Sequence, residues 1–150
     1  MISNSIGHWE FPHDFDSDDW FGFLYRIIEV PTGMEYVGKK QFGRHLRVKV
    51  KGRVNKKKVI KESDWKNYTG SSVRLNEAIK INGHDKYRFE IVSLHKTRAS
   101  LVYAEVRLQI NEEVLRTKLP NGTRKYYNGL IAGVKFIPPD EDAEEQKMKR

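Results

Sequence analysis

Two short apolar runs separated by a turn signal dominate residues 21–40. The turn signal is Pro31-Thr32-Gly33, and apolar runs on either side of such a signal predict a β-hairpin. Because side chains alternate between the two faces of a strand, Tyr25 and Tyr36 share a face when the connecting loop holds an even number of residues. A four-residue loop over 31–34 meets that condition.

The predicted register gathers residues with useful chemistry on one face of the hairpin. The four-residue loop sets Lys40 opposite Tyr25 and Gly38 opposite Ile27. Two phenols, an ammonium group and a patch left open by the glycine would then share this face, which could hold a phosphate and activate a water molecule. Hairpins also collect aromatic residues for packing alone, so the two tyrosines by themselves leave a structural role open.

The rest of the chain predicts two helices and a third strand. Ser72 is a good N-cap and Gly83 a good C-terminal stop for a helix over 73–82. Alternation of apolar and polar residues predicts a strand over 86–93, and apolar residues at helical spacing predict a long helix over 98–116. The apolar positions that carry these predictions are Leu75, Ala78 and Ile79, then Tyr87, Phe89 and Ile91, then Leu101, Ala104, Leu108 and Leu115.

This order predicts a small α+β domain with an antiparallel three-stranded sheet flanked by helices. We expect the domain to span 21–137 with a basic insertion at 39–61, preceded by an acidic, aromatic arm over 1–20 and followed by a charged tail over 138–150. The arm shows no strand or helix period. Either it packs its aromatic side chains on the domain, or it lies in a basic groove and leaves when nucleic acid binds.

The predicted insertion over 39–61 is strongly basic. The chain has a net charge of +8, and residues 39–61 contain eleven lysines and arginines and no acidic residue. Alternation over 46–51, followed by a turn signal at 52–55, predicts a strand and a turn there. An unneutralised run of this length is costly on a folded surface, so contact with phosphates explains it better than a solvated loop does. The expected DNA contacts in this segment are Lys39, His45, Lys49, Lys51, Arg53, Lys56, Lys57 and Lys58.

The composition excludes several kinds of site. The sequence has no cysteine, which excludes disulfides, thiolate zinc sites and cysteine nucleophiles and suits a reducing compartment. It has no apolar run of about eighteen residues that could span a membrane. Residues 1–7 lack the basic and apolar regions of a signal peptide. We therefore expect a cytoplasmic protein with no membrane partner.

Glu105 is out of place on the second predicted helix. Its neighbours about one turn away on either side, Leu101 and Leu108, belong to the apolar stripe. Burying an unpaired carboxylate is costly, so Glu105 either lies at the rim of the core or is kept for a task. Binding a divalent metal ion is a task that suits an isolated carboxylate.

Several short motifs stand in a fixed order along the chain. They are Phe23-Leu24-Tyr25, Tyr36-Val37-Gly38, Tyr68-Thr69-Gly70-Ser71-Ser72, Val102-Tyr103-Ala104-Glu105 and Tyr127-Asn128. This ordered set resembles the GIY-YIG nuclease family over roughly residues 21–130. The first motif keeps only its tyrosine and the second is a close match. The third motif is similar to phage-encoded members, including intron-borne homing enzymes.

The resemblance implies a metal-dependent endonuclease. It assigns the activation of water to Tyr25, or less often to Tyr36, and the binding of Mg²⁺ or Mn²⁺ to Glu105. A phenol is a poor base near neutral pH unless a cation lowers its pKa, and Lys40 across the hairpin is placed to do so. Lys40 is therefore a candidate catalytic residue.

The resemblance also gives roles to residues around these three. Gly38 would let the DNA backbone approach, and Ser71 and Ser72 would contact DNA. Asn128 would orient Glu105 or hold the edge of the sheet.

One feature of the family is missing at its expected place. The family has a catalytic arginine on a helix soon after the second tyrosine, but Leu46 stands ten residues after Tyr36. The basic insertion also interrupts the expected helix. The candidate replacements are Arg44 and Arg47, which flank that position, and Arg53, Lys39 and Lys40.

We therefore predict a metal-dependent DNA endonuclease, phage-associated and located in the cytoplasm of a bacterial host. Its sequence specificity would be low, or would come from the basic insertion or a protein partner. Two alternatives remain open. A non-catalytic nucleic-acid-binding module would bind in a salt-dependent way without needing Glu105. A structural or interaction protein that binds an acidic protein partner through the basic stretch would show no preference for DNA over other polyanions.

Overall fold

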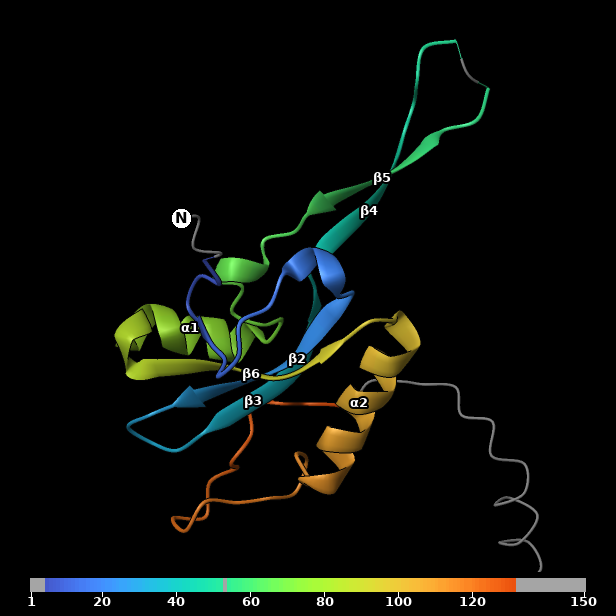
Figure 1. Cartoon of the computed structure of the whole chain (residues 1–150). Helices are drawn as coiled ribbons and strands as arrows, with labels where there is room; N and C mark the ends of the chain where they lie inside the picture. Colours follow the sequence, from blue (N-terminus) through green and yellow to red (C-terminus); the bar gives the residue numbers. More distant parts are fainter. Residues whose placement is uncertain (1–4, 53, 132–150) are drawn as a thin grey trace, which may run out of the picture.

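The computed structural model describes residues 5–52 and 54–131, with the backbone but not the side chains of residues 45–48. The predicted tail over 138–150 lies outside the described residues. Short 3₁₀ turns occur at Ser17–Asp19, Trp65–Asn67 and His84–Lys86. The strands are β1 (Trp9–Glu10), β2 (Gly22–Glu29), β3 (Glu35–Gln41), β4 (Gly43–Val48), β5 (Lys57–Glu62) and β6 (Tyr87–His95), and the helices are α1 (Val73–Asn82) and α2 (Arg98–Asn111) (Figure 1).

Four of the strands form one mixed sheet in the order β1-β6-β2-β3. β2 pairs antiparallel with both β3 and β6, whereas β1 pairs parallel with β6. The α+β class is confirmed, but the prediction of a three-stranded antiparallel sheet is wrong by one strand. β1 has two residues, too few to show an alternation in the sequence. It is held against the sheet by the burial of Trp9, which is 3% exposed.

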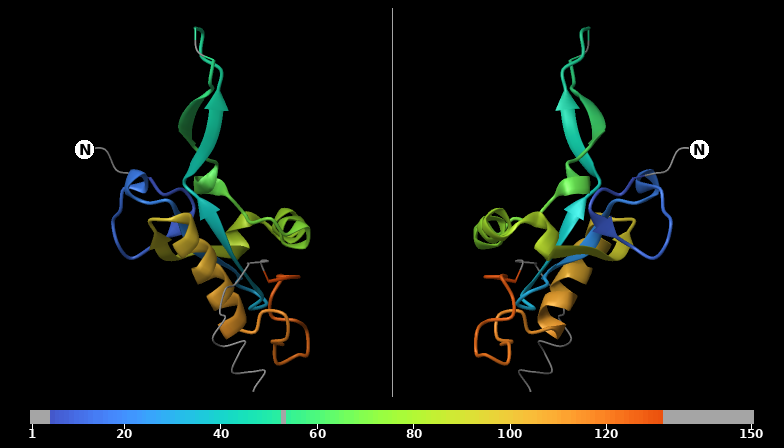
Figure 2. Two further views of the ribbon diagram at one scale, coloured as in Figure 1. Left: turned by 90° about the vertical axis from the view of Figure 1, so that its right-hand side faces the viewer. Right: turned by 90° about the vertical axis from the view of Figure 1, so that its left-hand side faces the viewer.

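The two helices cover opposite faces of the sheet (Figure 2). α1 begins after Ser72, whose hydroxyl accepts a hydrogen bond from the Leu75 amide, and it ends at Gly83, as the sequence predicts. Leu75 packs with Tyr25 in an aromatic-rich core on one face. On the other face, the side chain of Leu101 from α2 is buried.

The N-terminal arm packs on the same aromatic core. Trp9, Phe11 and Phe15 belong to that core or lie against it. Within the part of the chain that the structure describes, no carboxylate of the arm forms an ion pair with the basic segment. The arm therefore packs its aromatic side chains on the domain, which is the first of the two hypotheses.

α2 is shorter than the sequence predicts. The apolar spacing predicts a helix to residue 116, but α2 ends at Asn111. Glu113 adopts a φ of 50°, in the left-handed region, which stops the helix. Leu115, predicted in the apolar stripe, lies beyond this stop and is 42% exposed. Among the described residues no helix is long and apolar enough to cross a membrane.

The hairpin register differs from the predicted one by two residues. Tyr25 pairs with Gly38, where the prediction placed Lys40. The Glu29 amide donates to the Met34 carbonyl at 2.8 Å, which leaves residues 30–33 as the connection, one residue earlier than the predicted loop over 31–34, and Gly33 adopts a φ of 81° in it. A shift of two residues keeps every side chain on its face, so the two tyrosines still share one.

β4 and β5 form a separate antiparallel ribbon that projects from the body of the domain (Figures 1 and 2). Of the predicted strand over 46–51, residues 46–48 lie in β4, which begins earlier, at Gly43, and ends at Val48. The turn predicted at 52–55 stands between β4 and β5 in sequence, and residue 53 lies outside the described residues. The ribbon follows β3 directly, with buried Phe42 between them. The basic segment is therefore an extended structure anchored at the end of an edge strand.

Candidate active site

One edge of the sheet forms the candidate active site. β3 is an edge strand, and a cleft of about 430 Å³ opens beside it. The first turn of α1 forms one wall, α2 forms another, and residues 127–130 close the cleft. Because the helices lie on opposite faces, groups from both faces meet here. The lining includes the predicted site residues Tyr36, Lys39, Ser71, Ser72, Glu105 and Asn128.

Tyr36 brings a phenol to the wall formed by α1. Its hydroxyl lies 3.0 Å from the Ser71 hydroxyl, next to the N-cap Ser72. The amide groups at a helix N-terminus carry partial positive charge and attract anions. Arg74, in the first turn, adds a full positive charge to this wall. A phosphate in the cleft would meet hydroxyls, helix amides and a guanidinium group.

Tyr25 lies behind Tyr36 rather than in the cleft. It is 1% exposed, and the centres of the two tyrosine rings are 6.2 Å apart. Burial raises the pKa of Tyr25 well above its usual value, and the nearby Tyr36, Tyr68 and Glu105 raise it further. The Tyr25 hydroxyl therefore stays protonated near neutral pH.

The open patch expected at Gly38 is not present. A Cβ at this position would lie 2.6 Å from the Tyr25 hydroxyl, so the tyrosine ring fills the space that the glycine leaves. Gly38 is itself buried. The missing side chain makes room for Tyr25, not for the DNA backbone.

Lys40 does not lower the pKa of a phenol, contrary to the prediction. Its Nζ lies 2.7 Å from Asp64 and 4.2 Å from the ring centre of Tyr68. Burial is the main cause that raises the pKa of both Tyr25 and Tyr68. The shift in register accounts for the difference, because it places Phe23, not Tyr25, opposite Lys40.

Glu105 faces the cleft from α2. It is 6% exposed, and its Oε1 lies 3.5 Å from Lys39 Nζ. This oxygen accepts no hydrogen bond from the described residues. Burial raises the pKa of Glu105, and the attraction of Lys39 opposes that shift. The residue is a buried carboxylate with unused hydrogen-bonding capacity beside a cleft.

The donor set fits a metal site built on a single carboxylate. Mg²⁺ is commonly held by one or two carboxylates together with substrate phosphates and water. Oε1 of Glu105, which accepts no hydrogen bond from the described residues but pairs with Lys39 at 3.5 Å, is the ligand that such an ion needs. Over residues 5–52 and 54–131, no group of three or more histidine or acidic side chains could form a metal cage. A divalent ion here would need further ligands from the substrate, and Lys39 would compete for the carboxylate.

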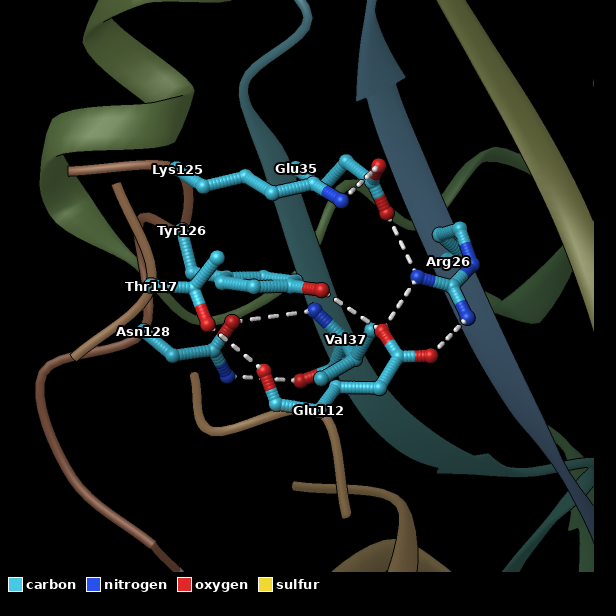
Figure 3. A network of polar contacts seen from close by, with 8 residues as sticks. All are labelled: Arg26, Glu35, Val37, Glu112, Thr117, Lys125, Tyr126 and Asn128. Atoms are coloured by element: carbon cyan, nitrogen blue, oxygen red, sulfur yellow. Dashed lines mark hydrogen bonds and ion pairs between the residues drawn. The ribbon is translucent and has the colours of Figure 1, made fainter. Parts of the chain in front are cut away.

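Asn128 joins the segment that closes the cleft to the edge strand. Its Nδ2 donates to the Val37 carbonyl at 2.8 Å, and its Oδ1 accepts from the Val37 amide at 3.0 Å (Figure 3). Both residues are buried. Of the two roles expected for Asn128, these contacts correspond to holding the sheet edge.

A polar network beside Asn128 fixes the end of α2 against the sheet (Figure 3). Arg26 on β2 donates to both carboxylate oxygens of Glu112, at 2.7 and 2.6 Å, and also pairs with Glu35 on β3. The Tyr126 hydroxyl donates to Glu112 at 2.7 Å. These bonds, with that of Arg26 first, lower the pKa of Glu112. The network holds α2, β3 and the segment that carries Asn128 in one arrangement.

The other predicted cations lie outside this cleft. Arg44 and Lys40 line a second cleft of about 280 Å³, together with Lys39 and Arg98. A third cleft of about 720 Å³, beside the N-terminal arm, contains none of the predicted catalytic residues. The ribbon region carries Lys49, Lys51, Lys56, Lys57 and Lys58. The side chains of His45 and Arg47 and the whole of Arg53 lie outside the described residues, so their roles stay predictions.

The sequence reasoning missed Arg74 and Gln109, which both line the cleft beside β3. The sequence contains a pattern that could have indicated each of them. Arg74 lies two residues after the predicted N-cap Ser72, so it had to stand in the first turn of α1. Gln109 is buried and follows Glu105 by four residues, which makes it a second polar residue on the apolar stripe of α2.

Comparison with known proteins identifies the family of this chain. A family model described as "Putative endonuclease segE, GIY-YIG domain" matches residues 8–131. The chain belongs to the GIY-YIG nuclease family. It is a Seg-like member, and the match includes Tyr25, Tyr36, Glu105 and Asn128. Membership of this GIY-YIG family implies endonuclease activity in general. No curated protein and no solved structure matches the chain significantly.

Proposed function

We propose that this GIY-YIG protein is a metal-dependent DNA endonuclease that hydrolyses a phosphodiester bond in the cleft beside β3. The observation that carries the proposal is the meeting of a phenol, Tyr36, and a buried carboxylate, Glu105, in one cleft. The net charge of +8 suits a polyanionic substrate. Phage association, the host cytoplasm as location and a protein partner that adds specificity belong to the same proposal.

Tyr36 is the phenol that we assign to the reacting water. Its hydroxyl reaches the cleft, and the hydroxyl of Ser71 lies within hydrogen-bonding distance, so the pair can orient a water molecule. Water attacks the phosphorus, the bond to the leaving oxygen breaks, and the proton of the water passes through this pair to solvent. Solvent returns a proton to the leaving oxygen. Tyr25 is a positioning residue, because its buried ring supports that of Tyr36.

Arg74 and Lys39 stabilise the negative charge that develops on the phosphate. Both line the cleft, on different walls, whereas Arg44 lines the second cleft instead. Fixed positive groups aimed at developing charge supply a large part of enzymatic rate enhancement. In this proposal the two residues do the work of the family's missing arginine.

Glu105 holds the metal ion. Lys39 helps to keep this buried carboxylate ionised before substrate arrives, because its attraction opposes the rise in pKa that burial causes. Mg²⁺ or Mn²⁺ at this position would polarise the phosphate and stabilise the leaving oxygen.

Cleavage of supercoiled plasmid with Mg²⁺ or Mn²⁺ tests the proposal. We expect nicked or linear products from the natural chain, none after chelation of the metal, and a loss of at least about 100-fold in Glu105→Gln with DNA binding retained. Glu77→Gln, on an exposed position of α1, is the matched control. Equal cleavage by the natural chain and Glu105→Gln would show that this carboxylate is not the metal ligand.

A non-catalytic DNA-binding module is the second candidate. Leu46 stands in place of the family's arginine, and Lys39 already pairs with Glu105 at 3.5 Å. This candidate predicts salt-dependent DNA binding that Glu105→Gln leaves unchanged, and no cleavage with either metal.

A further inference from the structure

Cations outside the catalytic cleft form a path from it onto the ribbon. Lys39 lines both the catalytic cleft and the second cleft, where Lys40, Arg44 and Arg98 join it. The described lining of the second cleft holds no acidic side chain, although Lys40 pairs with Asp64 at 2.7 Å. Arg44 is also the second residue of β4. Farther along, the ribbon region carries Lys49, Lys51, Lys56, Lys57, Lys58 and Lys61.

The charges of the ribbon work against its own stability. A two-stranded ribbon with no covering layer is marginally stable in water. The register sets Arg44 directly opposite Lys61, and like charges at such positions repel. Within the part of the chain that is described, neither cation forms an ion pair with a carboxylate. A surface of this kind gains stability when a polyanion neutralises it.

The dimensions of the ribbon match those of duplex DNA. From Gly43 to Gly52 the chain advances nine residues, at most about 30 Å at the rise of a strand. One turn of the double helix is about 34 Å long, and its major groove, about 12 Å wide, admits a two-stranded ribbon. A ribbon anchored beside the catalytic cleft can therefore follow a duplex for most of one turn.

We propose that the ribbon and the second cleft together bind duplex DNA and deliver it to the cleft beside β3. The location of the scissile phosphate rests on the proposed function, but binding by the ribbon does not require cleavage. Charge complementarity favours DNA over an acidic protein. The lysines are spread along an extended structure, and a duplex presents evenly spaced charges, about one for every 1.7 Å of its axis.

Salt-dependent binding to a 30-base-pair duplex tests the proposal. The measurement is made in a Glu105→Gln background so that no DNA is consumed. One variant changes Lys56, Lys57 and Lys58 to glutamine. Its matched control changes three exposed lysines of the domain body, Lys80, Lys86 and Lys118, to glutamine, and so removes the same charge.

We expect the ribbon variant to bind at least about 10-fold more weakly near 0.1 M salt. The slope of log affinity against log salt should fall by about 2 to 3, since each lost phosphate contact contributes about 0.9, and the control should change it by less than about 1. Equal effects of the two variants would overturn the proposal, because net charge alone would then explain binding. Unchanged affinity of the ribbon variant would also overturn it.

A second pair of variants tests the second cleft. Arg98→Gln should lower the salt slope by about 1, whereas Arg107→Gln, an exposed position farther along α2, should leave it unchanged. Equal slopes in the two variants would remove the second cleft from the proposed path.

Competition experiments with the natural ribbon test the kind of partner. A duplex should compete for binding much better than a single strand of the same sequence or polyglutamate. Equal competition by the single strand would refute the duplex as the bound form, and equal competition by polyglutamate would favour an acidic protein partner.

The proposal and the proposed function fail in different ways. Ribbon-dependent duplex binding without any cleavage would support the ribbon and refute the nuclease. Glu105-dependent cleavage that is unchanged when Lys56, Lys57 and Lys58 are changed to glutamine in the natural chain, with Glu105 intact, would do the reverse.

Discussion

Replacing Asn128 with alanine should destabilise the domain by about 2–4 kcal/mol. The change removes two hydrogen bonds, to the amide and the carbonyl of Val37, at a position that is 3% exposed. A buried polar group left without a partner costs about 1–3 kcal/mol, so two such groups set an upper limit of about 6 kcal/mol. Water can enter beside an edge strand and satisfy part of that demand. Because domains are commonly stable by about 5–15 kcal/mol, we expect the variant to fold.

Asn128→Asp tests the hydrogen bonds at nearly constant size. A carboxylate can accept the Val37 amide, but its second oxygen faces the Val37 carbonyl, where Nδ2 now donates at 2.8 Å. The protonated acid can donate to that carbonyl and restore both bonds. The folded-state pKa of the new carboxyl group would therefore lie above its unfolded value. The penalty applies at neutral pH and is lost as the pH falls through the folded pKa, so the stability gap to the natural chain should narrow between pH 7 and about pH 4.5.

Urea unfolding followed by tryptophan fluorescence measures both variants, because Trp9 and Trp65 are buried. Asn55→Ala, at an exposed position of the ribbon turn, is the control. A loss below about 0.5 kcal/mol in Asn128→Ala would refute the reasoning. Complete loss of cleavage in a fully folded Asn128→Ala would instead give this residue a part in the chemistry.

Three further predictions concern the phenols, the carboxylate and a half-buried imidazole. Tyr36→Phe should slow plasmid cleavage by at least about 100-fold, whereas Tyr25→Phe should mainly cost about 1 kcal/mol of stability; the opposite order would refute the assignment of the two phenols. Glu105→Gln should be at least as resistant to urea as the natural chain, because burial raises the pKa of this carboxyl group and ionising it at pH 7 opposes folding. A clear loss of stability would mean that the pair with Lys39 is worth more than the burial costs. Burial also lowers the pKa of the half-buried His8 from 6.5 to about 4, so the unfolded chain takes up this proton first and stability should fall between pH 6.5 and pH 4. The shift alone corresponds to about 3 kcal/mol, and solvent screening of this half-exposed ring reduces the expected loss to about 1–2 kcal/mol. In His8→Phe this part of the acid sensitivity should vanish; an unchanged pH profile of urea unfolding would assign it to other groups.

Features with a local signal could be predicted from the sequence. The cap Ser72 and the stop Gly83 bound α1 as expected. The faces of the hairpin could also be predicted, because an error of two residues in register leaves them unchanged. The register itself depends on turn geometry, which a Pro-Thr-Gly signal does not determine. β1 and the early end of α2 depend on tertiary burial and on one left-handed residue, Glu113, and neither leaves a periodic trace.

The candidate site could be predicted residue by residue but not as an arrangement. Tyr36 and Lys39 point to opposite faces of β3, yet both line one cleft because β3 is an edge strand. Strand order within a sheet is not present in a local pattern. The partner of Lys40, Asp64, lies beyond the whole ribbon in sequence, so no spacing rule could reveal that the lysine is already engaged.

The segment that closes the cleft has a consequence for the behaviour of the protein in concentrated solution. The Glu35 amide donates to the Lys125 carbonyl at 2.8 Å, and the Tyr127 amide donates to the Glu35 carbonyl at 2.8 Å, so this segment covers part of the open edge of β3. An uncovered edge strand is a template on which a second copy can add its own edge, which is how many β-proteins begin to aggregate. Substitutions that detach residues 125–128 would then harm the protein through self-association, even where each molecule keeps its fold.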